Sequence, residues 1–154
     1  MTRYAESTSV PSERSRGEIE RVLSRYGATA FMYGWTDKQA VISFEARNRR
    51  IKFLLPLPER GSKAFTRTPS RGTPRSAAQA EAAYEQAVRQ RWRALALVVK
   101  AKLEAVETGI TTFEEEFLAH IVLPDGNTVG GYMLPQIAQA YESGRMPPML
   151  PHLP

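Results

Sequence analysis

The feature that most restricts the fold is a long segment, Ala77 to Thr108, that contains neither glycine nor proline. Its larger apolar residues recur every three or four positions: Tyr84, Val88, Trp92, Leu95, Val99, Leu103 and Val106. This spacing predicts one continuous helix with a single apolar stripe, and the many alanines favour it. Such a helix would be about 45–50 Å long and would end at Gly109.

Three segments before this helix have the pattern of β-strands: 28–35, 39–46 and 49–55. The second alternates, with Ala40, Ile42, Phe44 and Ala46 on one face. The connections at 36–38 and 47–48 are so short that neighbouring strands must run antiparallel. The sequence therefore predicts a three-stranded meander.

A first helix is predicted to start near Ser12 or Ser15 and to run to about Tyr26, followed by Gly27 as its stop. Ser12 or Ser15 could cap its start, and Glu18 would complete a capping box with Ser15. After the meander, residues 59–76 are rich in Gly, Ser, Thr, Pro and Arg, which predicts a long, mobile loop.

The last third, 109–154, predicts a helical extension that ends in a proline-rich tail. Thr112 and Glu115 fit a capping box, and 128–142 fits a further helix. The alternative is a hairpin that pairs 120–123 with 128–132. The predicted fold is one α+β domain, 1–154, in which the meander packs on the long helix.

Charge is distributed unevenly along the chain. The net charge is +5, but residues 47–75 carry nine basic residues and one acid, whereas 108–154 carry one basic residue and five acids. A block this basic attracts polyanions.

The basic block predicts a nucleic-acid interface that runs from the third strand into the following loop. Phe65, between Lys63 and Arg67, could stack on a base, or it could dock on the core. The predicted contact residues are Arg47, Arg49, Arg50, Lys52, Arg60, Lys63, Phe65, Arg67, Arg71 and Arg75, with Arg89 and Arg93 of the long helix as a second phosphate contact. An acidic protein partner is a further alternative.

Two other patterns have competing interpretations. Phe31, Tyr33 and Trp35 alternate on the first strand, and we favour core packing over an open stacking platform. Glu85 lies four residues before Arg89, which predicts an ion pair on the helix surface.

Catalytic motifs are absent from the sequence. There is no cysteine, no phosphate-binding glycine loop and no nucleophile elbow. His120 and Glu116 could share a helix face, but two ligands do not make a metal site. We expect neither an enzyme nor a cofactor nor a metal. No apolar run approaches the length of a membrane span and no signal core is present, so we expect a protein of the cytoplasm, in the host cell if a phage encodes it.

Several segments resemble small, uncharacterised proteins encoded by bacteriophages and prophages. They are Ser15 to Ala28, Phe44 to Pro58, Arg91 to Val106 and Thr112 to Val129, which together cover most of the chain. The resemblance implies a phage origin and carries no activity. The order of elements is also similar to double-stranded-RNA-binding domains and to the core of phage single-strand annealing proteins. The first of these families has a Lys cluster at the start of its second helix, and 77–83 contains no Lys.

The sequence thus predicts a non-enzymatic protein that binds nucleic acid, single-stranded DNA in particular, in phage replication or recombination. The alternative is an interaction module that acts as an inhibitor or adaptor of a host complex. Its copies could associate head to tail, with the basic block of one against the acidic C-terminus of the next. Leu97 and Val98, beside the apolar stripe, would leave room for a homo-oligomer.

Overall fold

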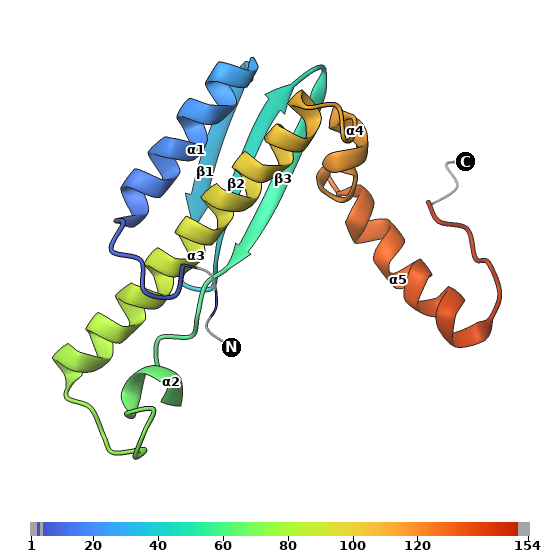
Figure 1. The fold of residues 1–154 in the computed structure, drawn as a ribbon. Helices are drawn as coiled ribbons and strands as arrows, with labels where there is room; N and C mark the ends of the chain where they lie inside the picture. Colours follow the sequence, from blue (N-terminus) through green and yellow to red (C-terminus); the bar gives the residue numbers. More distant parts are fainter. Residues whose placement is uncertain (1–2, 4, 151–154) are drawn as a thin grey trace.

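The computed structural model describes residue 3 and residues 5–150. Its elements, in chain order, are α1 (Ser12–Tyr26), β1 (Ala30–Trp35), β2 (Gln39–Ala46), β3 (Arg49–Pro56), α2 (Lys63–Thr66), α3 (Ala77–Glu107), α4 (Phe113–Glu116), the 3-10 turn η1 (Leu118–His120) and α5 (Val129–Ser143). The strands form one antiparallel sheet in the order β1-β2-β3 (Figure 1). The predicted α+β fold is confirmed.

The sheet has the predicted turns. Arg47 and Asn48 both have positive φ, 50° and 60°, which is the backbone of a two-residue hairpin whose twist matches that of its strands. In β2, buried side chains alternate with half-buried ones, as its sequence predicts. β1 starts at Ala30, two residues later than expected, and β3 extends one residue further, to Pro56.

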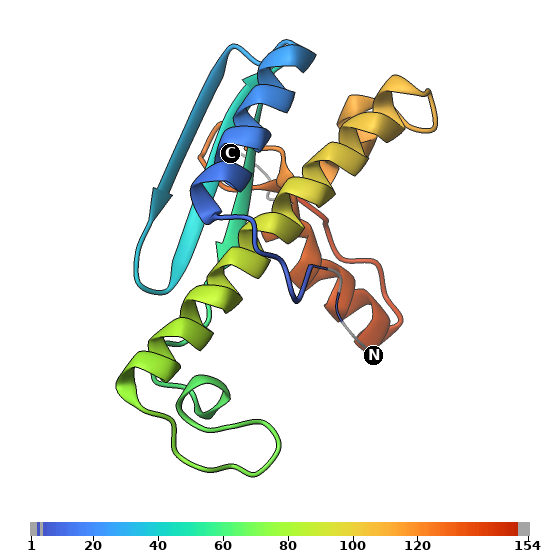
Figure 2. The same ribbon diagram turned by 60° about the vertical axis from the view of Figure 1, so that its left-hand side comes forward.

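Helices α1 and α3 cover one face of the sheet and form a single layer on it (Figures 1 and 2). The core lies between the two layers. Its largest fully buried side chains include Ile19, Ile42, Phe44, Ile51 and Val99. Phe117 closes this core from the C-terminal side, with its ring edge-on to Phe44 at a centroid distance of 5.9 Å.

The start of α1 differs from the prediction. The residue before the helix is Pro11, and no side chain caps the first turn. Ser15 lies in the second turn and is fully buried, and Glu18 pairs with Arg93 of α3 instead of completing a capping box. The predicted Ser12 or Ser15 cap is therefore wrong, because the apolar face of α1 turns Ser15 toward the core.

Helix α3 agrees with the long helix predicted from the stripe. It begins with a capping box in which Ser76 accepts from the backbone N–H of Gln79 and Gln79 accepts from that of Ser76. Its N-terminal half extends past the end of the sheet, where α2 packs against it (Figure 1). Tyr84 is buried in this half, and Trp92 is buried at the middle of the helix.

Residues 59–76, which we call the α2 lobe, have more local structure than the predicted loop. They contain the one-turn helix α2, capped by Ser62, and an isolated bridge between Arg67 and Pro74. Thr68 and Thr73 add hydrogen bonds across the same narrow loop. The expectation of a loop without secondary structure is thus corrected.

The C-terminal third leaves the body at the edge of β3. The predicted Thr112–Glu115 capping box is present. Ile121 bridges to Ile51, Val122 bridges to Thr128, and the predicted helix follows as α5. The alternative hairpin is reduced to the single bridge between 122 and 128. Of the proline-rich tail, residues 151–154 lie outside the described residues.

Candidate nucleic-acid interface

The predicted basic interface falls into two groups at opposite ends of β3. Arg47, Arg49 and Arg50 lie at the β2–β3 turn, which we call the hairpin end, whereas five cations belong to the α2 lobe. The six remaining residues of β3, 51–56, separate the groups by roughly 20 Å. The expected continuous basic surface is therefore corrected to two separate surfaces.

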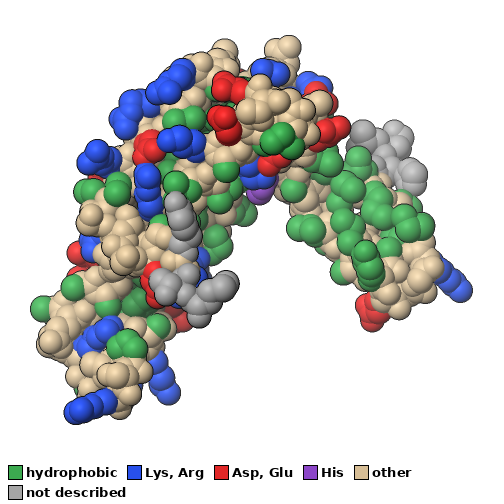
Figure 3. Space-filling model, viewed as in Figure 1, with side chains coloured by type: hydrophobic (Ala, Val, Ile, Leu, Met, Phe, Trp, Pro, Cys, Tyr) green, Lys and Arg blue, Asp and Glu red, His purple; other side chains and the backbone are tan. Residues whose placement is uncertain are grey.

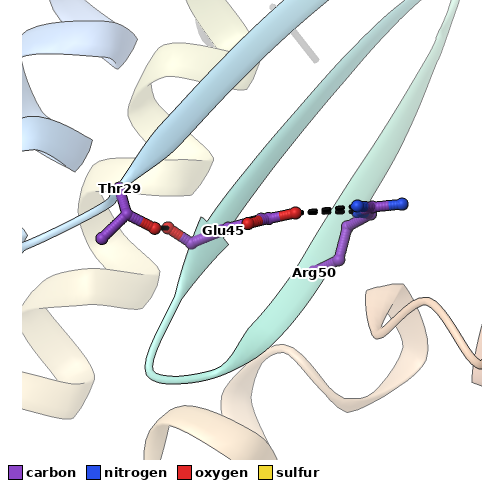
Figure 4. A network of polar contacts seen from close by, with 3 residues as sticks. All are labelled: Thr29, Glu45 and Arg50. Carbon is purple, nitrogen blue, oxygen red and sulfur yellow. Dashed lines mark hydrogen bonds and ion pairs between the residues drawn. The ribbon is translucent and has the colours of Figure 1, made fainter.

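Two of the three cations of the hairpin end are paired with acidic residues. Arg50 donates to the carboxylate of Glu45 across the sheet at 2.8 Å, next to the contact between Thr29 and the Glu45 carbonyl (Figure 4). Arg49 pairs with Glu114 of α4 at 2.9 Å. Arg47 lies over the ring of Tyr26, 5.0 Å from its centroid. These contacts reduce the positive potential that the sequence places here.

Lys52 lies two residues further along β3, opposite Ser43 of β2, and its side chain is half-buried. It faces the side of the sheet that the helices leave open. Lys52 thus belongs to neither group of cations.

Arg60 connects the α2 lobe to helix α3. Its guanidinium pairs with Glu81 and lies over the ring of Tyr84, 4.1 Å from the centroid. The hydrogen bond to Glu81 raises the pKa of Arg60. This residue fastens the lobe, and its charge is compensated.

The other four cations of the lobe have no carboxylate within ion-pair distance in the described part of the chain. They are Lys63, Arg67, Arg71 and Arg75. Arg67 donates to the carbonyl oxygen of Gly72 at 2.9 Å, and Arg75 donates to that of Phe65 at 3.2 Å. A carbonyl oxygen orients a guanidinium without cancelling its charge, so the lobe keeps four positive charges.

Phe65 holds the lobe in place and is not a free stacking surface. Its ring is edge-on to Tyr84 with centroids 5.8 Å apart, and the side chain is half-buried. The sequence left base stacking and docking on the protein as alternatives for Phe65, and in the structure Phe65 docks on the protein.

The aromatic residues of β1 differ from the prediction. Phe31 packs against the core, but Tyr33 is 51% and Trp35 is 74% exposed. Our preference for a core stripe is therefore wrong for these two residues. β1 is an edge strand, and near Tyr33 the layer of α1 contributes the guanidinium of Arg16, which lies 4.8 Å from the ring centroid.

Trp35 lines a surface groove between the start of α1, the β1–β2 turn and the first half of α3. Tyr84 and Trp92 contribute to the same groove. It is bordered by four basic residues, Arg16, Lys38, Arg60 and Arg89, and by four acidic ones, Glu13, Asp37, Glu59 and Glu85. The groove touches the α2 lobe at Arg60 and Gly61, so an extended ligand could pass from one to the other.

Arg89 and Arg93 do not act together. Arg93 pairs with Glu18 between α3 and α1, both side chains being about three-quarters covered. Arg89 donates to Gln86 at 2.6 Å and lies beside the groove, so the predicted Glu85–Arg89 pair is replaced by Gln86–Arg89. Only Arg89 of the two is placed to contact a ligand.

Sequence patterns did not identify Arg16 or Lys38 as site residues, and they indicated Trp35 only as part of a stacking platform that we favoured less than core packing. The available signal was the position of Trp35 at the end of a strand, directly before the turn 36–38. Arg16 could not have been included, because it belongs to another element and only the packing of α1 on β1 brings it near.

No cluster of three or more potential metal ligands occurs within residues 3 and 5–150. Glu116 accepts from Lys102 at 3.2 Å, whereas His120 stacks on Phe53 with centroids 4.0 Å apart. Burial lowers the pKa of His120, and the charge of Lys102 lowers it further. Over the same residues, no helix has the length and apolarity required to cross a membrane.

Comparisons with family models, with curated proteins and with solved structures find no match for this chain. The resemblance to phage-encoded proteins stays a prediction.

Proposed function

We propose that this protein binds single-stranded nucleic acid, DNA in particular, without sequence specificity, through the α2 lobe and the adjoining groove. The observation that carries the proposal is the set of four lobe cations, Lys63, Arg67, Arg71 and Arg75, that have no carboxylate partner among the described residues. The lobe that carries them extends away from the sheet (Figure 1).

The chemistry of the lobe suits a phosphate backbone. Arg67 and Arg75 each use N–H donors on a carbonyl oxygen, and a guanidinium has five donors, so others remain for phosphate oxygens. Neutralising several phosphates releases condensed counterions, which supplies affinity without reading the sequence. The hairpin end contributes less, because Glu45 and Glu114 already compensate two of its arginines.

The preference for single strands rests on Trp35. Its side chain is largely exposed and lines the groove that meets the lobe at Arg60. An unpaired base can stack on such a ring, whereas a base within a duplex has its faces covered. Arg16 and Arg89 lie along the same groove as phosphate or base contacts.

The proposal is tested by fluorescence anisotropy with a labelled oligothymidine and a duplex of equal length, over a series of salt concentrations. A variant with Lys63, Arg67, Arg71 and Arg75 changed to Ala should lose at least tenfold in affinity at low salt. The slope of log K against log salt should fall by about 3, since each lost phosphate contact of a single strand removes about 0.7.

A matched control removes the same charge elsewhere. Arg14, Arg21 and Arg25 of α1 and Arg145 are exposed and lie outside the lobe, and changing all four to Ala should reduce affinity much less. The proposal is wrong if the wild-type protein does not bind at low salt. It is also wrong if the control variant loses as much affinity as the lobe variant.

An interaction module driven by charge is the alternative function. Such a module would need attraction between the basic block of one copy and the acidic C-terminal third of another. Within a single chain, Arg49 of the basic block already pairs with Glu114 of the acidic third. This contact leaves less charge for head-to-tail association, so nucleic-acid binding stays the leading proposal.

A further inference from the structure

Helix α5 forms an arm that touches little of its own chain. Among the other elements it packs on η1, and its buried residues are the first two, Val129 and Gly130. Beyond this base the arm runs away from the sheet (Figure 1), and a broad hollow separates it from the body (Figure 3). We define the arm as residues 129–150.

The arm presents an apolar surface to solvent. Leu134, Ile137 and Tyr141 follow one another at helical spacing on one face, and Leu134 and Tyr141 are 63% and 89% exposed. Glu142 is the one charged residue in α5. Hydrophobic side chains accordingly dominate the arm in Figure 3. An uncharged surface of this kind marks a site of contact with another surface.

A second apolar surface lies on the sheet. α1 and α3 cover one face, and the opposite face, which we call the open face, carries Met32, Val41 and Leu54. Gly34, Val41 and Leu54 are direct partners across the three strands, and Met32 and Leu54 are more than half exposed. The apolar part of this face is one end of it: Ser43 and Lys52 lie in the row next to Val41 and Leu54, and Glu45 and Arg50 follow toward the hairpin end.

We propose that the arm of one copy packs on the open face of a second copy, and that the exchange is reciprocal. The dimensions agree, because a helix of 15 residues is about 22 Å long and a strand of eight residues is about 26 Å long. The sheet has a helical layer on one face only, and a helix on the open face would add a helical layer on the other. The arm packs on η1 and runs away from the sheet, so it does not lie on the open face of its own chain (Figure 1).

The area that would be buried favours reciprocal exchange over a simple pair of arms. A helix about 22 Å long and 10 Å wide covers roughly 220 Å² of a flat partner. Two arms on two sheets bury four such strips, about 900 Å², and the exposed Met146 and Leu150 of each arm would bring the total to the roughly 1,000 Å² that a specific interface needs. Two arms packed on each other bury half as much, well below the area of a stable interface. Arg145 is the one cation of the arm, and so small a positive charge argues against an anionic membrane as the partner.

The chain has no cysteine, which permits a direct test by engineered disulfides. Ile137→Cys and Leu54→Cys proteins are purified separately, mixed after nuclease treatment and oxidised mildly. Exchange predicts a disulfide-linked dimer in the mixture at several times the yield of either variant alone. A pair of arms predicts that Ile137→Cys alone is linked as well as the mixture, and this result would overturn the proposal.

The mass in solution is the second measurement. The wild type should approach twice the 17.3 kDa chain mass as its concentration rises. Ile137→Asp should weaken association at least tenfold, whereas Gln139→Asp, on the opposite side of α5, should not. A wild type that stays monomeric up to several hundred micromolar would overturn the proposal. Both measurements omit nucleic acid, so their outcome is separate from that of the function proposed above.

Discussion

At the scale of single residues, Trp35 is the side chain whose role is most sharply testable. If a base stacks on its ring, Trp35→Ala should weaken binding of a single-stranded oligonucleotide by about 1–3 kcal/mol, or five- to 150-fold. Met32→Ala is the control, since Met32 is equally exposed on the same strand but points to the open face. Equal affinities of the Trp35 variant and the wild type would remove Trp35 from the interface.

His120 predicts how stability depends on pH. Its pKa is lowered in the folded protein, mainly by burial and then by Lys102, while a hydrogen bond with the backbone of Lys52 acts in the opposite direction. Below pH 6.5 the unfolded chain therefore binds more protons at this site than the folded chain does. The free energy of unfolding should fall as the pH is lowered from 7.5 to 5.5.

The contribution of His120 is isolated by substitution. His120→Asn cannot take up this proton, so its free energy of unfolding in urea should change less over the same pH range. Identical pH slopes for the variant and the wild type would show that His120 keeps its ordinary pKa in the folded protein.

At the scale of elements, the sequence predicted a helix or strand correctly where the residues of that element alone carry the pattern. Helix α3 has a stripe without Gly or Pro, and β2 alternates, so both were predicted with bounds within one residue. The cap of α1 and the α2 lobe were not. Ser15 looks like a cap until the packing of α1 buries it. α2 is held by contacts of Phe65 and Arg60 with Tyr84, which lies 19 and 24 residues further along the chain.

The base of the arm depends on a glycine. A Cβ on Gly130 would lie 2.8 Å from the carbonyl oxygen of Ala119, closer than such atoms approach in proteins. Gly130→Ala should therefore detach α5 from η1, although Ala favours the helix itself by about 1 kcal/mol. Limited proteolysis should cut between residues 121 and 150 several times faster than in the wild type. Gly61→Ala, whose added Cβ would contact nothing within 4 Å, should leave that rate unchanged.

At the scale of the whole molecule, the uneven charge of the sequence is redistributed by the fold. The nine basic residues of 47–75 are contiguous in sequence, but β3 separates them into two surfaces, and acidic residues from β2, α3 and α4 neutralise three of them. Which of the nine stay without an acidic partner depends on contacts between distant segments. For this reason the sequence could identify the basic block but could not select the lobe within it.

The molecule also combines a packed body with an arm that has few contacts, and hydrogen exchange should separate the two. Amides in β2 and in α3 around Val99 lie in the core and should exchange only through global unfolding. An isolated 15-residue helix is marginal in water, and Pro135 removes one of its hydrogen bonds, so amides of α5 should exchange orders of magnitude faster in dilute protein. Raising the protein concentration should slow exchange in α5 and at Leu54 together, because one contact between copies covers both. Protection of α5 equal to that of β2 in dilute, monomeric protein would show that the arm is stable without a partner.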